Sequence, residues 1–96
     1  MNKVELRVDA YRQAQRAVAD LKAAVLALLA AAEPGGMSNS QVGRLLGIYQ
    51  GHVGHEGHIS RTVLQMLQAD GVIEQEGPRG VWRLKADPNV QNDPPD

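Results

Sequence analysis

The chain has 96 residues, the size of one small domain with short extensions, and its 43% hydrophobic and 22% charged residues are ordinary for a globular protein. It contains no cysteine, which excludes disulfides, cysteine nucleophiles and thiolate-bound zinc. With one Trp, two Tyr and no Phe, the core must consist of Leu, Val, Ile and Ala. A core this small needs a further source of stability, such as a second subunit. The net charge of −1 gives no global sign of nucleic-acid binding.

The sequence predicts a cytoplasmic protein that does not enter a membrane. Residues 1–5 show no apolar stretch of the kind found in signal peptides. The longest apolar run, residues 23–32, is far shorter than the roughly 20 residues that cross a bilayer. With no cysteine to exploit an oxidising compartment, we expect the cytoplasm.

Residues 4–33 contain neither Gly nor Pro and are rich in helix-forming residues, which predicts one long helix. Apolar residues recur at alternating spacings of four and three, the pattern of a heptad seam. The seam consists of Tyr11, Ala14, Val18, Leu21, Val25, Leu28 and Ala32. Its alternation of Val and Leu favours two-stranded pairing. We expect the later residues to pack on the chain's own core as well, and we assign dimerisation to Tyr11, Ala14, Val18 and Leu21.

A second helix is expected to start after the break at residues 34–36. Ser38 and Gln41 have the spacing of a capping box, in which each side chain satisfies the other's backbone amide. Val42, Leu45 and Leu46 provide an apolar stripe. Gly47 stands where helices commonly end.

A third helix is expected to end before Gly71. Ser60 is a candidate N-cap, with Ile59 and Leu64 placed as a hydrophobic staple. A start nearer Glu56 is also compatible with the sequence.

Two short strands follow, at residues 72–75 and 81–84, around a turn rich in Gly and Pro. Trp82 and Leu84 alternate with Val81 and Arg83 and give the hairpin an apolar face. Residues 86–96 carry three aspartates and three prolines, so we predict a disordered acidic tail.

The predicted fold class is mainly α with a small β-hairpin. Three helices followed by a hairpin resemble a winged helix-turn-helix with a long N-terminal helix. The resemblance rests on Ile59-Ser60-Arg61-Thr62-Val63, Leu67, Gly71-Val72-Ile73-Glu74 and Trp82-Arg83-Leu84. These segments look like the recognition helix and wing of MarR-like and ArsR-like bacterial regulators and of winged modules in restriction proteins, over residues 21–85. One departure is the long Gly- and His-rich segment before the third helix, where such proteins usually turn in about four residues.

The resemblance implies DNA binding, with the third helix in the major groove and the wing against the minor groove or backbone. At about 100° per residue, Arg61, Gln65 and Gln68 fall on the arc of the third helix opposite the apolar residues Ile59, Val63, Leu64, Met66 and Leu67. Arg61 and Gln65 are expected to read bases, because Arg pairs with guanine and Gln with adenine, and Gln68 and His58 assist them. The other candidates are Arg79 at the wing tip and, for the backbone, Arg44, Arg83 and Lys85. An ordinary solvated helix face would also carry such side chains.

Residues 1–85 contain ten basic and eight acidic residues, a small surplus of positive charge. A monomer offering so few phosphate contacts would bind DNA poorly, and a dimer doubles them. The charge pattern therefore favours DNA binding only for a homodimer.

His52, His55 and His58 recur at a spacing of three, with Glu56 among them. Converging imidazoles would suit a metal ion, but this spacing spreads side chains around a helix, so only a looped backbone could bring them together. There are three alternatives to a metal site. The imidazoles and glycine amides could contact phosphates, the segment could be a pH-sensitive switch, or it could be a polar packed loop beside Tyr49. We adopt the loop and assign no metal.

No pattern points to an enzyme or a cofactor: paired carboxylates, a nucleophile triad and a phosphate-binding loop are missing from the sequence. We therefore expect a dimeric winged-helix DNA-binding protein, a transcriptional regulator or accessory factor. Its parts are a dimerising extension (residues 1–20), the winged domain (residues 21–85) and the tail (residues 86–96). The alternative is a winged-helix module that binds a protein partner instead of double-stranded DNA.

Overall fold

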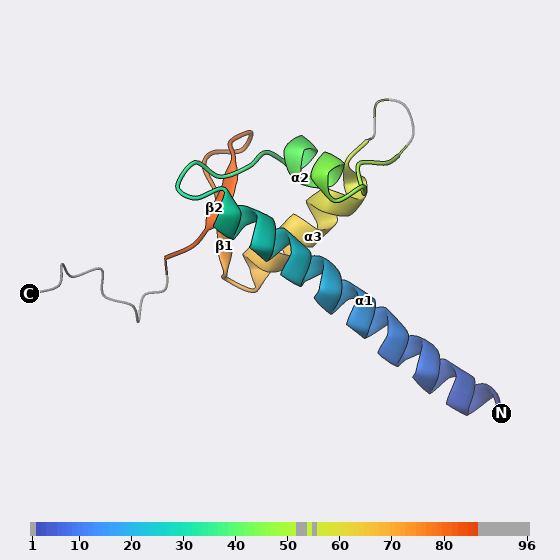
Figure 1. Ribbon diagram of the computed structural model, residues 1–96. Coiled ribbons are helices and arrows are strands. Elements are labelled where there is room, and N and C mark those ends of the chain that lie inside the picture. Colours follow the sequence, from blue (N-terminus) through green and yellow to red (C-terminus); the bar gives the residue numbers. More distant parts are fainter. Residues whose placement is uncertain (1, 52–53, 55, 87–96) are drawn as a thin grey trace, which may run out of the picture.

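A computed structural model describes residues 2–51, 54 and 56–86. Three helices precede a two-stranded antiparallel hairpin (Figure 1). The elements are α1 (Lys3–Ala31), α2 (Asn39–Leu45), α3 (His58–Ala69), β1 (Ile73–Gln75) and β2 (Trp82–Leu84). The predicted mainly helical class with a small hairpin is confirmed. The predicted acidic tail lies outside the described residues, apart from Ala86.

Helix α1 is the long helix that the sequence predicted, shifted by about one turn or less at either end. The side chain of Asn2 caps it by accepting a hydrogen bond from the backbone amide of Glu5 at 2.8 Å. Every residue of its projecting segment (residues 3–17) is exposed, whereas Val25 and Leu29 in its docked segment (residues 18–31) are fully buried. Figure 1 shows the projecting segment reaching well beyond the other elements.

Helix α2 begins with the predicted capping box. The Gln41 amide donates to the Ser38 hydroxyl at 3.2 Å, and the Ser38 amide donates to the Gln41 side chain at 2.9 Å. The predicted apolar stripe is wrong at Leu45, which is 63% exposed. The buried face is centred between Val42 and Gly43, and at about 100° per residue this centre turns Leu46 inward and Leu45 outward.

Helix α3 takes the earlier of the two predicted starts. Gly57 occupies the N-cap position with a left-handed φ of +86°. The staple and cap assigned to Ile59 and Ser60 are therefore wrong, because both residues lie inside the first turn. The earlier start rotates Ser60 into the core and leaves Ile59 43% exposed.

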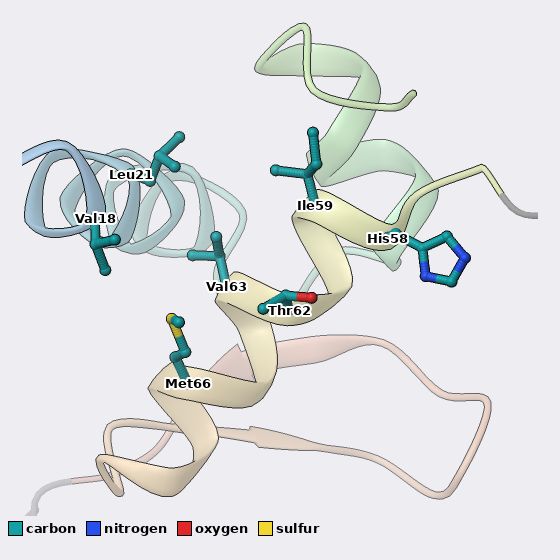
Figure 2. A pocket seen from close by; sticks show the side chains of 7 residues that line it. All are labelled: Val18, Leu21, His58, Ile59, Thr62, Val63 and Met66. Carbon is teal, nitrogen blue, oxygen red and sulfur yellow. The ribbon is translucent and has the colours of Figure 1, made fainter. Parts of the chain in front are cut away.

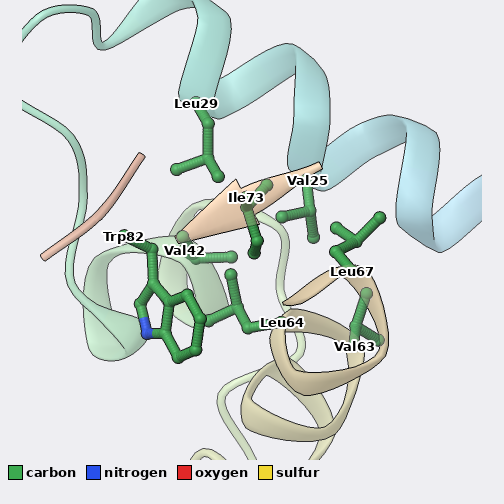
Figure 3. Packing of buried hydrophobic residues seen from close by; sticks show 8 residues of the cluster. All are labelled: Val25, Leu29, Val42, Val63, Leu64, Leu67, Ile73 and Trp82. Carbon is green, nitrogen blue, oxygen red and sulfur yellow. The ribbon is translucent and has the colours of Figure 1, made fainter. Parts of the chain in front are cut away.

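One hydrophobic core joins all five elements (Figure 3). It consists of Val25, Leu29, Val42, Val63, Leu64, Leu67, Ile73 and Trp82. The hairpin pairs Ile73 with Leu84 and Gln75 with Trp82. A further β-bridge connects Trp82 with Met37. The Met37 amide donates to the Trp82 carbonyl at 2.9 Å, and the Trp82 amide donates to the Met37 carbonyl at 2.6 Å. The segment between α1 and α2 thus lies along the outer edge of β2.

Candidate nucleic-acid interface

Helix α3 presents a polar face away from the core. Val63, Leu64 and Leu67 hold the helix in the core, and this orientation leaves Arg61, Gln65 and Gln68 exposed, as the sequence predicted. His58 is exposed at the start of the same helix. Thr62 is exposed as well and was not among the predicted contacts, although helical periodicity places it only about 60° around the axis from Gln65.

A small polar network fixes the start of α3 to the start of α2. The buried Ser60 hydroxyl lies 2.8 Å from Asn39 Oδ1 and 3.1 Å from the Gly57 carbonyl oxygen. The Asn39 side-chain amide donates to the same carbonyl at 3.2 Å. Twelve residues separate α2 from α3. A four-residue turn would hold the two helices together because it is short, whereas here the polar network holds their ends together.

Gly57 is required for this anchor. A Cβ atom there would lie 2.7 Å from Asn39 Nδ2 and 2.8 Å from Tyr49 Cε2, and its left-handed backbone favours glycine in any case. The ring of Tyr49 also carries the guanidinium of Arg44, 4.8 Å from its centroid. Arg44, a predicted phosphate contact, is thus exposed on the last turn of α2, and the Tyr49 ring helps to position its guanidinium.

The hairpin holds three further predicted contacts. Arg79 is exposed in the loop between the strands, and Lys85 is exposed just after β2. Arg83 is half-buried and forms an ion pair with Glu76, so its charge is partly neutralised. The Gln75 side chain donates to the Gly80 carbonyl at 3.1 Å and thereby braces the loop.

An apolar groove separates α1 from α3 (Figure 2). This α1–α3 groove has a volume of about 300 Å³. Val18 and Leu21 line it from α1, and His58, Ile59, Thr62, Val63 and Met66 line it from α3. The sequence placed Ile59 and Met66 on the apolar side of α3, but the structure leaves Met66 38% exposed at the groove.

The predicted dimerisation residues divide between two places. Tyr11 and Ala14 are exposed on the projecting segment of α1, whereas Val18 and Leu21 are half-buried at the α1–α3 groove. Figure 2 shows the hairpin loop on the side of α3 where the His58 ring lies, with α1 on the other side. His58 and Thr62 belong to both surfaces, so the polar face of α3 borders the groove, and Arg61, Gln65 and Gln68 lie outside the groove lining.

The predicted histidine cluster is only partly visible, because His52 and His55 lie outside the described residues. Among the residues that the structure does describe, no group of three or more acidic or histidine side chains could hold a metal ion. Within the same ranges, no helix is long and apolar enough to span a bilayer.

Comparison of the chain with protein families, with curated proteins and with solved structures gave no match.

Proposed function

We propose that the protein is a homodimeric winged helix-turn-helix DNA-binding protein, a transcriptional regulator or an accessory factor. The observation that carries this proposal is the exposed polar face of α3, with Arg61, Gln65 and Gln68 held in place by the core and by the Ser60 network. Residues 21–85 would form the winged domain and residues 1–20 the dimerising extension. The order of three helices and a hairpin supports this assignment.

The polar face of α3 has the dimensions of a short base-reading surface. Arg61 and Gln68 are seven residues apart, about 10 Å along the helix, and bases stack about 3.4 Å apart. The face therefore spans about three base pairs in a major groove wide enough to admit a helix. Arg61 would bind guanine and Gln65 adenine, each through two hydrogen bonds.

The electrostatics of one copy are weak, which is why the proposal includes a dimer. Lys22 is paired with Asp70 at 2.8 Å, and Arg83 is paired with Glu76. Arg44, Arg79 and Lys85 are left as exposed candidates for phosphate contacts. Two copies double these contacts and read two half-sites.

A salt-dependent binding assay on mixed duplex DNA tests the proposal. Arg61→Ala should weaken binding to the preferred sequence by about tenfold or more, the value of one bidentate base contact. Arg79→Ala should weaken binding to all sequences alike and lower the salt slope by about one. Arg12→Ala, on the charged side of the projecting segment, is the matched control and should change neither quantity. Absence of binding by the wild-type chain at low salt would refute the proposal.

A second candidate function is a module that binds a protein partner. It is favoured by the exposed apolar side chains of the projecting segment, Val4, Leu6, Val8 and Tyr11. The two candidates separate in the same assay, because a protein-binding module has no affinity for duplex DNA at any salt concentration.

A further inference from the structure

The projecting segment of α1 and the α1–α3 groove complement each other. We propose that two copies pair antiparallel along their projecting segments, and that the first turns of each α1 fill the α1–α3 groove of the other copy. This inference deepens the proposed function, because it rests on the homodimer and names the surfaces that form it.

The projecting segment has one uncovered apolar face. At about 100° per residue, Val4, Tyr11, Ala14 and Val18 continue the face that Leu21, Val25 and Leu29 turn toward the core. Of the six charged residues of this segment, Glu5, Asp9, Arg12 and Arg16 gather on the opposite face, whereas Lys3 and Arg7 lie on the apolar side. This separation predicts a helix that is covered on one side. A helical segment of about 15 residues is also marginal in water unless something packs against it.

The seam spacing selects one antiparallel register. Tyr11 faces the partner's Ala14, Val18 faces the partner's Arg7, and Leu21 faces the partner's Val4. Two-fold symmetry repeats each of these layers once. Shortening the overlap by one heptad would leave Val18 and Leu21 uncovered, and lengthening it would direct the partner against Val25, which is already fully buried.

Arg7 disfavours the parallel alternative. It lies on the apolar face, so a parallel in-register pair would set the two Arg7 guanidinium groups against each other. In the antiparallel register each Arg7 faces Val18, and the two arginines stand about 16 Å apart along the axis. The methylene groups of Arg7 can cover Val18 while the guanidinium reaches water.

The register brings an apolar end to an apolar groove. The partner's Val4 arrives opposite Leu21, which lines the α1–α3 groove together with Ile59 and Met66 of α3 (Figure 2). Val8 follows one turn after Val4 and is also exposed. A cavity of about 150 Å³ takes up a benzene molecule, so the groove of about 300 Å³ has room for aliphatic side chains from one turn.

The distance along the chain favours a second copy as the occupant. Val4 and Leu21 are 17 residues apart, and the centre of the register falls between Tyr11 and Ala14. Because α1 is one continuous helix, Val4 is held about 25 Å from Leu21 of its own chain and cannot reach its own groove, whereas Val4 of a second copy can.

Cysteine cross-linking tests the arrangement, because the full chain contains no cysteine of its own. Val4→Cys protein mixed with Ile59→Cys protein should form a mixed disulfide under mild oxidation. A mixture with Val72→Cys is the matched control, since Val72 is 41% exposed, close to the 43% of Ile59, but lies beside the hairpin. We expect the Ile59 mixture to cross-link about tenfold faster or more, owing to the higher local concentration.

Val4→Cys protein alone distinguishes the antiparallel pair from a parallel one. Its two thiols would be about 25 Å apart in the antiparallel pair, beyond disulfide reach, and adjacent in a parallel pair. Rapid cross-linking of Val4→Cys alone, or equal rates in the Ile59 and Val72 mixtures, would overturn the inference.

DNA binding measured in parallel separates the two proposals. The expected cross-links without DNA binding contradict the proposed function alone, and DNA binding without them contradicts this inference alone.

Discussion

The two segments of α1 share a continuous backbone and one heptad seam, yet they differ in what covers the seam. In the docked segment, α3 and the hairpin lie against it, and the seam residue Val25 and the adjacent Leu29 are fully buried. In the projecting segment, the seam residues Tyr11 and Ala14 are exposed. The repeat therefore specifies that a face is to be covered but not which chain covers it. Four experiments test this comparison.

Removal of residues 1–16 should have the largest effect, because it deletes most of the uncovered seam. We expect the full chain to sediment as a dimer and the shortened protein as a monomer. The core begins beyond the deletion, so the fluorescence of Trp82, the single tryptophan, should still report a folded interior. A dimer that survives the deletion would place the interface elsewhere.

Leu29→Ala and Leu6→Ala compare the same substitution in the two segments. Leu29 is fully buried, and its truncation should lower the free energy of unfolding by about 2–5 kcal/mol. Leu6 lies at the flank of the projecting segment and is exposed, so its truncation should cost about 0.5 kcal/mol or less. Urea unfolding followed by Trp82 fluorescence measures both. Equal losses would mean that the projecting segment is as deeply buried as the docked one.

Ala27→Gly and Ala10→Gly compare helix propensity at two exposed positions. Each substitution costs about 1 kcal/mol where the helix is formed. In the docked segment, this loss should appear at every protein concentration. In the projecting segment, it should appear only at concentrations where the dimer forms, because in the proposed pair the partner stabilises the helix there. A loss at Ala10 that does not depend on concentration would contradict this dependence.

Asp70→Asn should have the smallest effect. Asp70 at the end of α3 pairs with Lys22, near the point where the two segments of α1 meet. Both side chains are partly exposed, so removal of the pair should cost less than about 1 kcal/mol. The difference from wild type should shrink as salt is added. A larger, salt-independent loss would show that the pair is needed to hold α1 against α3.

Local rules predicted much of this fold from the sequence. The run without Gly or Pro predicted α1, and the Ser38–Gln41 spacing predicted the start of α2, because both depend on neighbours in the chain. Leu45 and Ile59 were misplaced for the opposite reason. Their exposure depends on the rotation of a short helix in the core, which the packing of other elements sets.

The candidate site divides in the same way. Helical periodicity was sufficient to predict that Arg61, Gln65 and Gln68 are exposed. The bond between Ser60 and Asn39 was not predictable, because it joins residues 21 positions apart across an irregular segment. The pairing of Arg83 with Glu76 depends on the loop that closes the hairpin, which the strand alternation does not specify.

Helix α1 passes from the projecting segment into the core without a glycine or proline. Such a helix has a fixed rise of about 1.5 Å per residue and little freedom to bend. In the proposed pair, the number of residues in this helix therefore sets the distance between the two α3 surfaces proposed to bind DNA. Seven residues inserted between Tyr11 and Ala14 would keep the seam in phase and move those surfaces about 10 Å further apart, or about three base pairs.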